Sequence, residues 1–405
     1  MPKSVLFSGR AWLGRAICLA GLGLLLPNLP LRAQSGAGTL IYGDSAYAQS
    51  HYGRAVRLRD GALLATFLKC DPMGGFPLYK STTDGASWRY VTTFLPSDYG
   101  LPNGSSTCPT LYVLPRRLGS YAAGTILLAF TYVGGGATNR LFRSTDGGVS
   151  WTAHGALAPK TAGTPGAVTW EPEFGLSRTG QLVCYYSDER QPGYSQCLAH
   201  EVSDDGGATW TGWTLDVGAR DAKSRPGMPR VVRLKNGSYF MVYEYINGQP
   251  DGGIHYKTSP DGLDWGPATD FGPLIQARNG ARPSNTPELG YLDDGSPNGR
   301  LFVRGMLDTH KETQFFANSA NGAGDWTETD APLTIAKVSE KQGGYSGTLL
   351  ALSGTRLLEV NSTHNGRYDE IRSGTKSFGA AVRPGGRPAP APAKPTRQAR
   401  LRAPR

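Results

Sequence analysis

Two glutamates are the residues of this chain best suited to chemistry. Glu171 stands in the segment Trp-Glu-Pro, and Glu244 ends the apolar segment Met-Val-Tyr-Glu. Two carboxyl groups that face each other across a pocket can hydrolyse a glycosidic bond. One attacks the anomeric carbon or activates water, and the other protonates the leaving oxygen. Tyr345, in Gly-Gly-Tyr-Ser, is the third candidate. We therefore predict Glu171, Glu244 and Tyr345 as the catalytic residues.

A second carboxylate stands close to the first of these candidates. Glu173 follows Glu171 at a spacing of two, and residues two apart on a strand point to the same side. Glu173 is therefore an alternative for the role of Glu171, which we favour. The aromatic residue Trp170 could stack on a sugar ring, or it could be part of the core. Of the neighbours Tyr185 and Tyr186, one must face the core, because successive side chains alternate in direction.

An internal repeat predicts the elements that position these residues. Ser144 to Trp151 and Ser203 to Trp210 share the pattern Ser-x-Asp-x-Gly-x-Ser/Thr-Trp, and shorter or degenerate copies end at Trp88, Trp265 and Trp326. The tryptophans are therefore 63, 59, 55 and 61 residues apart. A period of this length, filled by short strands and Gly-rich turns, is typical of four-stranded propeller blades. In each copy we expect the Asp to accept backbone N–H bonds in a tight turn and the Trp to pack between sheets.

The strands follow the same period and predict six blades. In blade three we expect strands at 170–176, 181–187 and 197–203, and in blade four at 229–234, 239–245 and 253–258. The last blade would take three strands from 345–352, 356–360 and 368–373. Residues 39–42 would supply its fourth strand and close the ring. The fold class is thus all-β, a six-bladed propeller of antiparallel four-stranded blades.

This topology places the loops that begin innermost strands and end second strands on one face. Loops on one face of a rigid scaffold are the expected place for a site. Besides the three catalytic candidates, that face would carry the predicted substrate-binding residues Arg54, Asp71, Trp170, Asp188, Arg225 and Asn285.

The two ends of the chain have a different composition. Residues 1–33 resemble a secretory signal peptide, with a basic start, an apolar stretch too short to span a bilayer with ease, and a small-residue cleavage site. Residues 34–380 would form the propeller. Residues 381–405 are rich in Pro, Ala and Arg, and we expect them to be disordered. We therefore predict a secreted or periplasmic protein without a membrane anchor after signal removal.

The charge of the chain is concentrated in these ends. The formal net charge is +10, yet 1–33 holds four basic residues and 381–405 holds seven, with no acid in either. The folded body is left with a charge of −1. The high isoelectric point is therefore no sign of a nucleic-acid groove, and no nucleic-acid partner is predicted. The expected partner is an oligo- or polysaccharide, and we expect a monomer.

Four cysteines follow the predicted leader. Cys184 and Cys197 lie symmetrically about a turn near Gln191, so they could be cross-strand neighbours and form a disulfide. A Cys70–Cys108 disulfide is a second candidate. The scattered His and Cys residues show no zinc-ligand spacing, and neither a metal nor a cofactor is predicted.

The repeat resembles the Asp-box of sialidases and related propellers. Glu171, Pro172 and Gly180 match a sialidase segment, but that family has an Arg sixteen residues after the Glu, where this chain has Ser187. The missing Arg belongs to a cluster that clamps the sialic acid carboxylate, and a serine cannot replace its charge. Arg54-Ala-Val stands where sialidases have Arg-Ile-Pro. The resemblance therefore disfavours sialic acid hydrolysis.

A closer resemblance is to the exo-arabinanases of glycoside hydrolase family 93. It is carried by residues 170–172, 183–188, 225–229 and 241–244, and extends loosely over residues 40–375. The resemblance implies Glu171 as nucleophile, Glu244 as acid/base and Tyr345 as the residue that assists the nucleophile. It also implies an exo-acting, retaining enzyme that trims neutral α-1,5-linked arabinan to arabinobiose. A sialidase and a non-catalytic glycan-binding propeller remain the alternatives.

Overall fold

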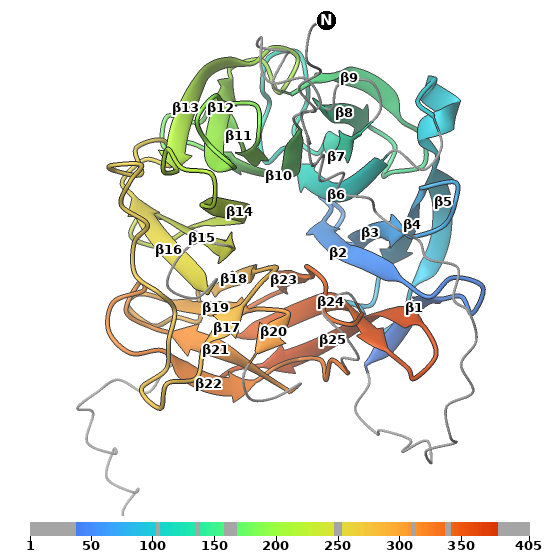
Figure 1. The fold of residues 1–405 in the computed structure, drawn as a ribbon. Coiled ribbons are helices and arrows are strands. Elements are labelled where there is room, and N and C mark those ends of the chain that lie inside the picture. Colours follow the sequence, from blue (N-terminus) through green and yellow to red (C-terminus); the bar gives the residue numbers. More distant parts are fainter. Residues whose placement is uncertain are drawn as a thin grey trace, which may run out of the picture.

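The computed structural model describes residues 38–102, 106–133, 138–157, 168–246, 253–308, 313–336 and 342–379. Six antiparallel sheets stand as blades around a central axis (Figure 1). This confirms the predicted six-bladed propeller. The predicted signal peptide and basic tail lie outside the described residues.

Each of the first three blades is one four-stranded sheet, ordered outward from the axis as along the chain. Blade one contains β2 (Ser50–Arg57), β3 (Leu63–Lys69), β4 (Phe76–Ser81) and β5 (Arg89–Phe94). A short 3-10 helix, η1 (Pro96–Tyr99), leads to blade two, which contains β6 (Ser106–Val113), β7 (Ile126–Tyr132), β8 (Thr138–Ser144) and β9 (Thr152–Ala156). Blade three contains β10 (Thr169–Leu176), β11 (Leu182–Asp188), β12 (Cys197–Ser203) and β13 (Thr211–Val217).

The remaining blades vary this plan. Blade four contains β14 (Arg225–Arg233), β15 (Tyr239–Ile246) and β16 (Ile254–Ser259), and a bridge between His255 and Leu274 lines its outer edge. Blade five contains β18 (Glu288–Leu292), β19 (Arg300–Arg304), β21 (Gln314–Asn318) and β22 (Thr327–Asp330), with the small pair β17 (Pro283–Ser284) and β20 (Leu307–Asp308) beside it. The predicted strands of blades three and four match the observed ones to within a few residues.

The ring is closed by strands from both ends of the chain. Blade six contains β23 (Thr348–Ala351), β24 (Arg356–His364) and β25 (Asp369–Ser377), and β1 (Thr39–Gly43) is its outer strand. Thr39 pairs with Ser373 and Gly43 pairs with Glu370. Figure 1 shows the blue β1 beside the red β25. The predicted closure through residues 39–42 is thereby confirmed.

The repeated motif forms a hydrogen-bonded turn, as expected. In blade two, Asp146 accepts the backbone N–H of Ser150 at 3.0 Å and its hydroxyl at 2.6 Å. The hydroxyl of Ser144 accepts the N–H of Gly148 at 2.9 Å. Trp151 is buried in the apolar cluster between blades one and two, where its ring meets that of Phe94 edge-on. The motif therefore ends a blade and packs it against its neighbour.

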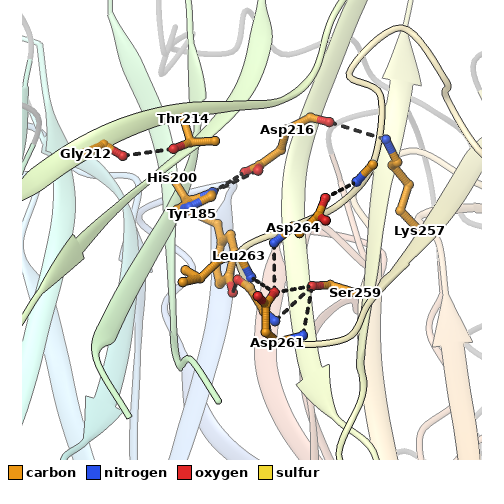
Figure 2. A network of polar contacts seen from close by, with 12 residues as sticks. Tyr185, His200, Gly212, Thr214, Asp216, Lys257, Ser259, Asp261, Leu263 and Asp264 are labelled. Atoms are coloured by element: carbon orange, nitrogen blue, oxygen red, sulfur yellow. Dashed lines mark hydrogen bonds and ion pairs between the residues drawn. The ribbon is translucent and has the colours of Figure 1, made fainter. Parts of the chain in front are cut away.

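Polar contacts join blades three and four, the two blades that carry the candidate glutamates (Figure 2). The ring of His200 bonds the carboxylate of Asp216 at 2.8 Å, and Lys257 of blade four donates to the backbone oxygen of Asp216 at 3.4 Å. The hydroxyl of Tyr185 donates to the carbonyl of Gly262, in the turn of blade four's motif. These contacts hold the two blades in one relative position.

The innermost strands of blades one to four bend close to their starts. A β-bulge interrupts the pairing of β2, β6, β10 and β14 close to its start. At each of these four bends a residue other than glycine takes a positive φ, and so does one residue at the equivalent place in blades five and six. In the order of the blades, these residues are Tyr52, Cys108, Glu171, Met228, Asn285 and Ser346. Such a conformation is unfavourable for these residue types and is common at functional sites.

The expected disulfides are wrong. None of the four described cysteines forms a disulfide. The predicted hairpin is present, but its strands pair Cys184 with Glu201 and Cys197 with Asp188. The centre of the hairpin therefore lies two residues after the position near Gln191 that the sequence predicts. As a result, Cys184 and Cys197 are not cross-strand neighbours. Cys108 instead lies at the bend of β6, beside Glu171.

Candidate active site

Glu171 lies at the bend of β10, where its backbone φ is 46°. The Ser187 hydroxyl, from the neighbouring strand β11, donates a hydrogen bond to Glu171 Oε2 at 2.9 Å. The Cys108 thiol of blade two approaches Oε1 at 3.8 Å. The bulge turns Glu171 out of the regular pleat of β10. Its carboxyl group is therefore in contact with both blade three, through Ser187, and blade two, through Cys108.

Glu244 lies near the end of β15, the second strand of blade four, and is only 7% exposed. Its Oε2 atom accepts the backbone N–H of Thr286 at 2.6 Å. Thr286 belongs to the bend of blade five and has a positive φ of 44°. The predicted substrate-binding residue Asn285 directly precedes it, so its backbone helps to aim this N–H at the carboxylate.

Glu244 and Ser187, the residue that bonds Glu171, both approach Gly227, in the bend of β14. A Cβ atom placed on Gly227 would lie 3.5 Å from Glu244 Oε1 and 3.6 Å from Ser187 Oγ, the atom that bonds Glu171. It would also lie 2.7 Å from Gln196 Nε2. Any side chain here would crowd the site, so the absence of one lets blades three and four bring their glutamates together.

Burial changes the acidity of both glutamates. The pKa of Glu171 is raised to about 7, first by burial and then by the negative charge of Glu244. The pKa of Glu244 is also raised to about 7 by burial, against the opposing effects of the Thr286 N–H and Arg225. Two interacting carboxyl groups of this kind titrate in separate steps, so near neutral pH one can hold a proton while the other is ionised. That is the state an acid and a nucleophile require.

Tyr345, the third predicted catalytic residue, precedes the bend of blade six, and its phenol is close enough to both glutamates for their charges to act on it. Its ring stacks on His51, with ring centroids 4.7 Å apart, and meets Tyr52 edge-on at 5.3 Å. Both glutamates act on its phenol and, with burial, raise its pKa. Among the described residues its hydroxyl is hydrogen-bonded to Tyr52 rather than to Glu171. The expectation that this tyrosine lowers the pKa of Glu171 through a direct bond therefore does not hold in this structure.

Glu173 does not occupy the position of Glu171. The bulge between Trp170 and Glu173 breaks the alternation on which that comparison depended. Glu173 instead forms an ion pair with Arg230 at 2.8 Å, one layer further along the axis. The two glutamates therefore sit in different environments.

Arg54 lies in the same deeper layer. It is 4% exposed, and its guanidinium donates to Ser346 Oγ at 3.0 Å and to the carbonyl of Gly347 at 3.2 Å. Arg54 and Arg230 both line a cavity of about 160 Å³. Arg54 is thus below the carboxylate pair rather than beside it.

Arg225 is close to the pair. It lowers the pKa of Glu244 through its charge, and it is held by an ion pair with Glu189 and by a bond to Gln196 Oε1 at 2.8 Å. Gln196 is the residue that also approaches Gly227. Of the predicted substrate-binding residues, Arg225 and Asn285 therefore lie nearest to Glu244.

Three other predicted substrate-binding residues make structural contacts. Asp188 is fully buried and bonds Arg190 at 2.8 Å and the indole N–H of Trp213 at 3.1 Å. Trp170 is partly buried and packs against the apolar cluster between blades one and two. Asp71 accepts the N–H of Gly74 in a turn and lines a separate groove of about 300 Å³ on blade one.

Ser187 is the residue that sequence reasoning undervalued. It was noted only as the place where a sialidase arginine is missing. In the structure its hydroxyl donates to Glu171 and accepts the backbone N–H of Met228 at 3.1 Å, which joins blade three to the bend of blade four. Its spacing of sixteen residues from Glu171 was the available signal.

The described residues thus form a six-bladed propeller, and two neighbouring blades carry the glutamates that the sequence predicts as catalytic. No protein-family model matches the sequence, and no curated protein matches it. Solved structures do. The Fusarium graminearum α-L-arabinofuranosidase Arb93A of family GH93 is 24% identical, with a TM-score of 0.72 over 84% of this chain and 97% of that one.

A second similar structure is the Penicillium chrysogenum α-L-arabinanase complexed with arabinobiose. It is 29% identical, with a TM-score of 0.71 over 84% of this chain and 98% of that one. A Hadza microbial sialidase shares the fold at 14% identity and a TM-score of 0.58, covering 80% of this chain and 65% of that one. The chain is therefore similar to arabinan-cleaving GH93 enzymes and to sialidase-like propellers. This similarity supports a glycoside hydrolase.

Within the ranges that the structure describes, no group of three or more His, Cys, Asp or Glu side chains could hold a metal ion. No helix in the same ranges is long and apolar enough to cross a membrane.

Proposed function

We propose that this protein is an exo-acting, retaining glycoside hydrolase that releases arabinobiose from neutral α-1,5-linked arabinan. Glu171 is the nucleophile, Glu244 is the acid/base and Tyr345 assists the nucleophile. The observation that carries the proposal is a pair of interacting carboxyl groups on neighbouring blades, each with its pKa raised to about 7 and each held by a hydrogen bond, from Ser187 to Glu171 and from Thr286 to Glu244. The role of each glutamate follows the resemblance carried by residues 170–172 and 241–244.

In the first step, ionised Glu171 attacks the anomeric carbon while protonated Glu244 gives its proton to the leaving oxygen. The Ser187 hydroxyl favours the ionised form of Glu171 by hydrogen bonding to it. In the second step, Glu244 takes a proton from water while the water oxygen attacks the anomeric carbon. The bond from that carbon to Glu171 breaks, and the sugar leaves with its configuration retained. Retention requires the carboxyl groups to be about 5–5.5 Å apart.

A neutral substrate is supported by the charges around the pair. The position of a sialidase arginine is taken by Ser187, and Arg54 lies one layer below the carboxylates with its guanidinium bonded to Ser346 and Gly347. One arginine of the clamp that a carboxylate-bearing sugar would need is therefore missing, which favours a neutral sugar.

The test is hydrolysis of linear arabinan, with sialyl-lactose as the competing substrate. Arabinobiose as the early product and no release of sialic acid would support the proposal. Glu171→Gln and Glu244→Gln should each lower kcat by orders of magnitude, since both changes are nearly isosteric. Release of sialic acid would point to a sialidase. Binding of arabinan without any hydrolysis by the wild type would point to a non-catalytic binding protein.

The roles of the two glutamates can be separated by azide rescue. With an activated aryl arabinoside, Glu244→Ala plus azide should give a glycosyl azide of retained configuration. Glu171→Ala plus azide should give the inverted product, because azide then replaces the missing nucleophile. The reverse pattern would exchange the two assignments.

A further inference from the structure

Beneath the carboxylate pair, the axis of the propeller contains a small cavity with two buried cations. The cavity, of about 160 Å³, is lined by Arg54, Arg230, Glu173 and Thr110, together with apolar residues of blades one, two, four, five and six. Arg54 is 4% exposed and Arg230 is 9% exposed. Charged groups this deeply buried normally have a charged partner, because their desolvation is costly.

The charges in this layer are unequal. Arg230 has an ion pair with Glu173, but Arg54 has no carboxylate within salt-bridge distance among the described residues. Its guanidinium bonds only carbonyl and hydroxyl oxygens of Gly53, Ser346 and Gly347. Burial and the charge of nearby Arg230 lower the pKa of Arg54 to about 9, so it is still a cation at neutral pH.

Donors remain for a ligand. The Nε atoms of both Arg54 and Arg230 are buried and have no hydrogen-bond partner. Each side chain also donates to the same atom, Ser346 Oγ, at 3.0 Å, so the two guanidinium groups are close together. Burial and the neighbouring Glu359 raise the pKa of Glu288, which favours its neutral form. Among the residues that line the cavity, two guanidinium groups therefore face one carboxylate, which leaves one positive charge in surplus.

We propose that this axial cavity is a binding site for one small monovalent anion of the halide class, held between Arg54 of blade one and Arg230 of blade four. The surplus of one charge fits a monovalent ion better than sulfate or phosphate. The apolar walls, which include Leu111, Leu289 and Leu349, favour a weakly hydrated ion. The ion would connect blades across the axis and so stabilise the closed ring.

The experiment measures thermal unfolding of the full chain in sodium gluconate while bromide replaces gluconate at constant ionic strength. Gluconate serves as the bulky, strongly hydrated reference anion. A ligand that binds only the folded state raises the midpoint as its concentration exceeds Kd. We expect a saturable rise for the wild type and for Arg89→Met, an exposed control on β5. Arg54→Met should weaken the apparent affinity at least tenfold, and Glu173→Gln should tighten it.

Crystals soaked in bromide give a second measurement that needs no variant. An anomalous peak between the two guanidinium groups is expected. Equal bromide dependence in Arg54→Met would place the ion elsewhere and overturn the proposal. Absence of both the saturable rise and the peak would mean that the cavity holds water only. Tighter binding of phosphate than of bromide would overturn the monovalent assignment.

Discussion

Replacing Glu244 by glutamine should stabilise the folded protein while it abolishes activity. The carboxyl group is 7% exposed, and its pKa rises from an ordinary value of 4.5 to about 7 on folding. Below pH 4.5 the carboxyl group is protonated in both the folded and the unfolded chain, so the contribution of Glu244 to the free energy of unfolding is fully present there. This contribution is lost as the pH rises through about 7, because the unfolded chain ionises first.

The size of this effect follows from the pKa values. Each pKa unit corresponds to about 1.4 kcal/mol, so ionised Glu244 costs the folded state about 3 kcal/mol at pH 8. Glutamine removes that cost and keeps an oxygen to accept the N–H of Thr286. We therefore expect Glu244→Gln to match the wild type at pH 4 and to be more stable by about 3 kcal/mol at pH 8.

The assay is urea unfolding followed by tryptophan fluorescence at several pH values between 4 and 8. Glu328→Gln, on the outer strand β22 of blade five, is the matched control and should gain no stability with pH. The difference in the free energy of unfolding between Glu244→Gln and the wild type could instead stay constant across this pH range. The ionised carboxyl group of Glu244 would then not destabilise the folded state. The account of the site given above would then be wrong.

Three further predictions concern neighbouring groups. Ser187→Ala removes a hydrogen bond to the ionised form of Glu171, and such a bond is worth about 1.5–3 kcal/mol. The acid limb of the pH profile of kcat/KM should therefore move upward by about one pH unit or more. An unmoved limb would refute the role of this hydroxyl. Tyr345→Phe should lower kcat at least tenfold and leave the melting temperature nearly unchanged, because the ring still stacks on His51; a loss of stability equal to the loss of activity would indicate a structural role only. Protein purified and denatured without reductant should be alkylated at Cys184, and mass spectrometry that finds this cysteine in a disulfide would contradict the observed register.

The architecture could be predicted because it is repeated. Five tryptophans at nearly constant intervals fix the blade length, and the turn around Asp146 forms from residues that are adjacent in the sequence. The closure by residues 39–42 followed from counting blades. Each of these conclusions uses local contacts or a period, both of which a single sequence displays.

The details of the site could not be predicted because they depend on bulges and on contacts between blades. An extra residue in β10 changes the direction of Glu171 relative to Glu173, and alternation along a strand cannot reveal it. The same kind of error, two residues in the register of a hairpin, placed Cys184 opposite Cys197. The bond from Ser187 to Met228 joins segments 41 residues apart, and no pattern in either segment indicates it.

The bends at the start of the innermost strands have a consequence for how such a protein can change during evolution. Six backbones take a positive φ at equivalent places of the six blades, but the residues there carry different chemistry, from the thiol of Cys108 and the carboxylate of Glu171 to the thioether of Met228. A single codon change at any bend exchanges a functional group without requiring a new loop. The ring therefore offers interchangeable positions, so a new activity could arise on a blade other than the one that holds the present nucleophile.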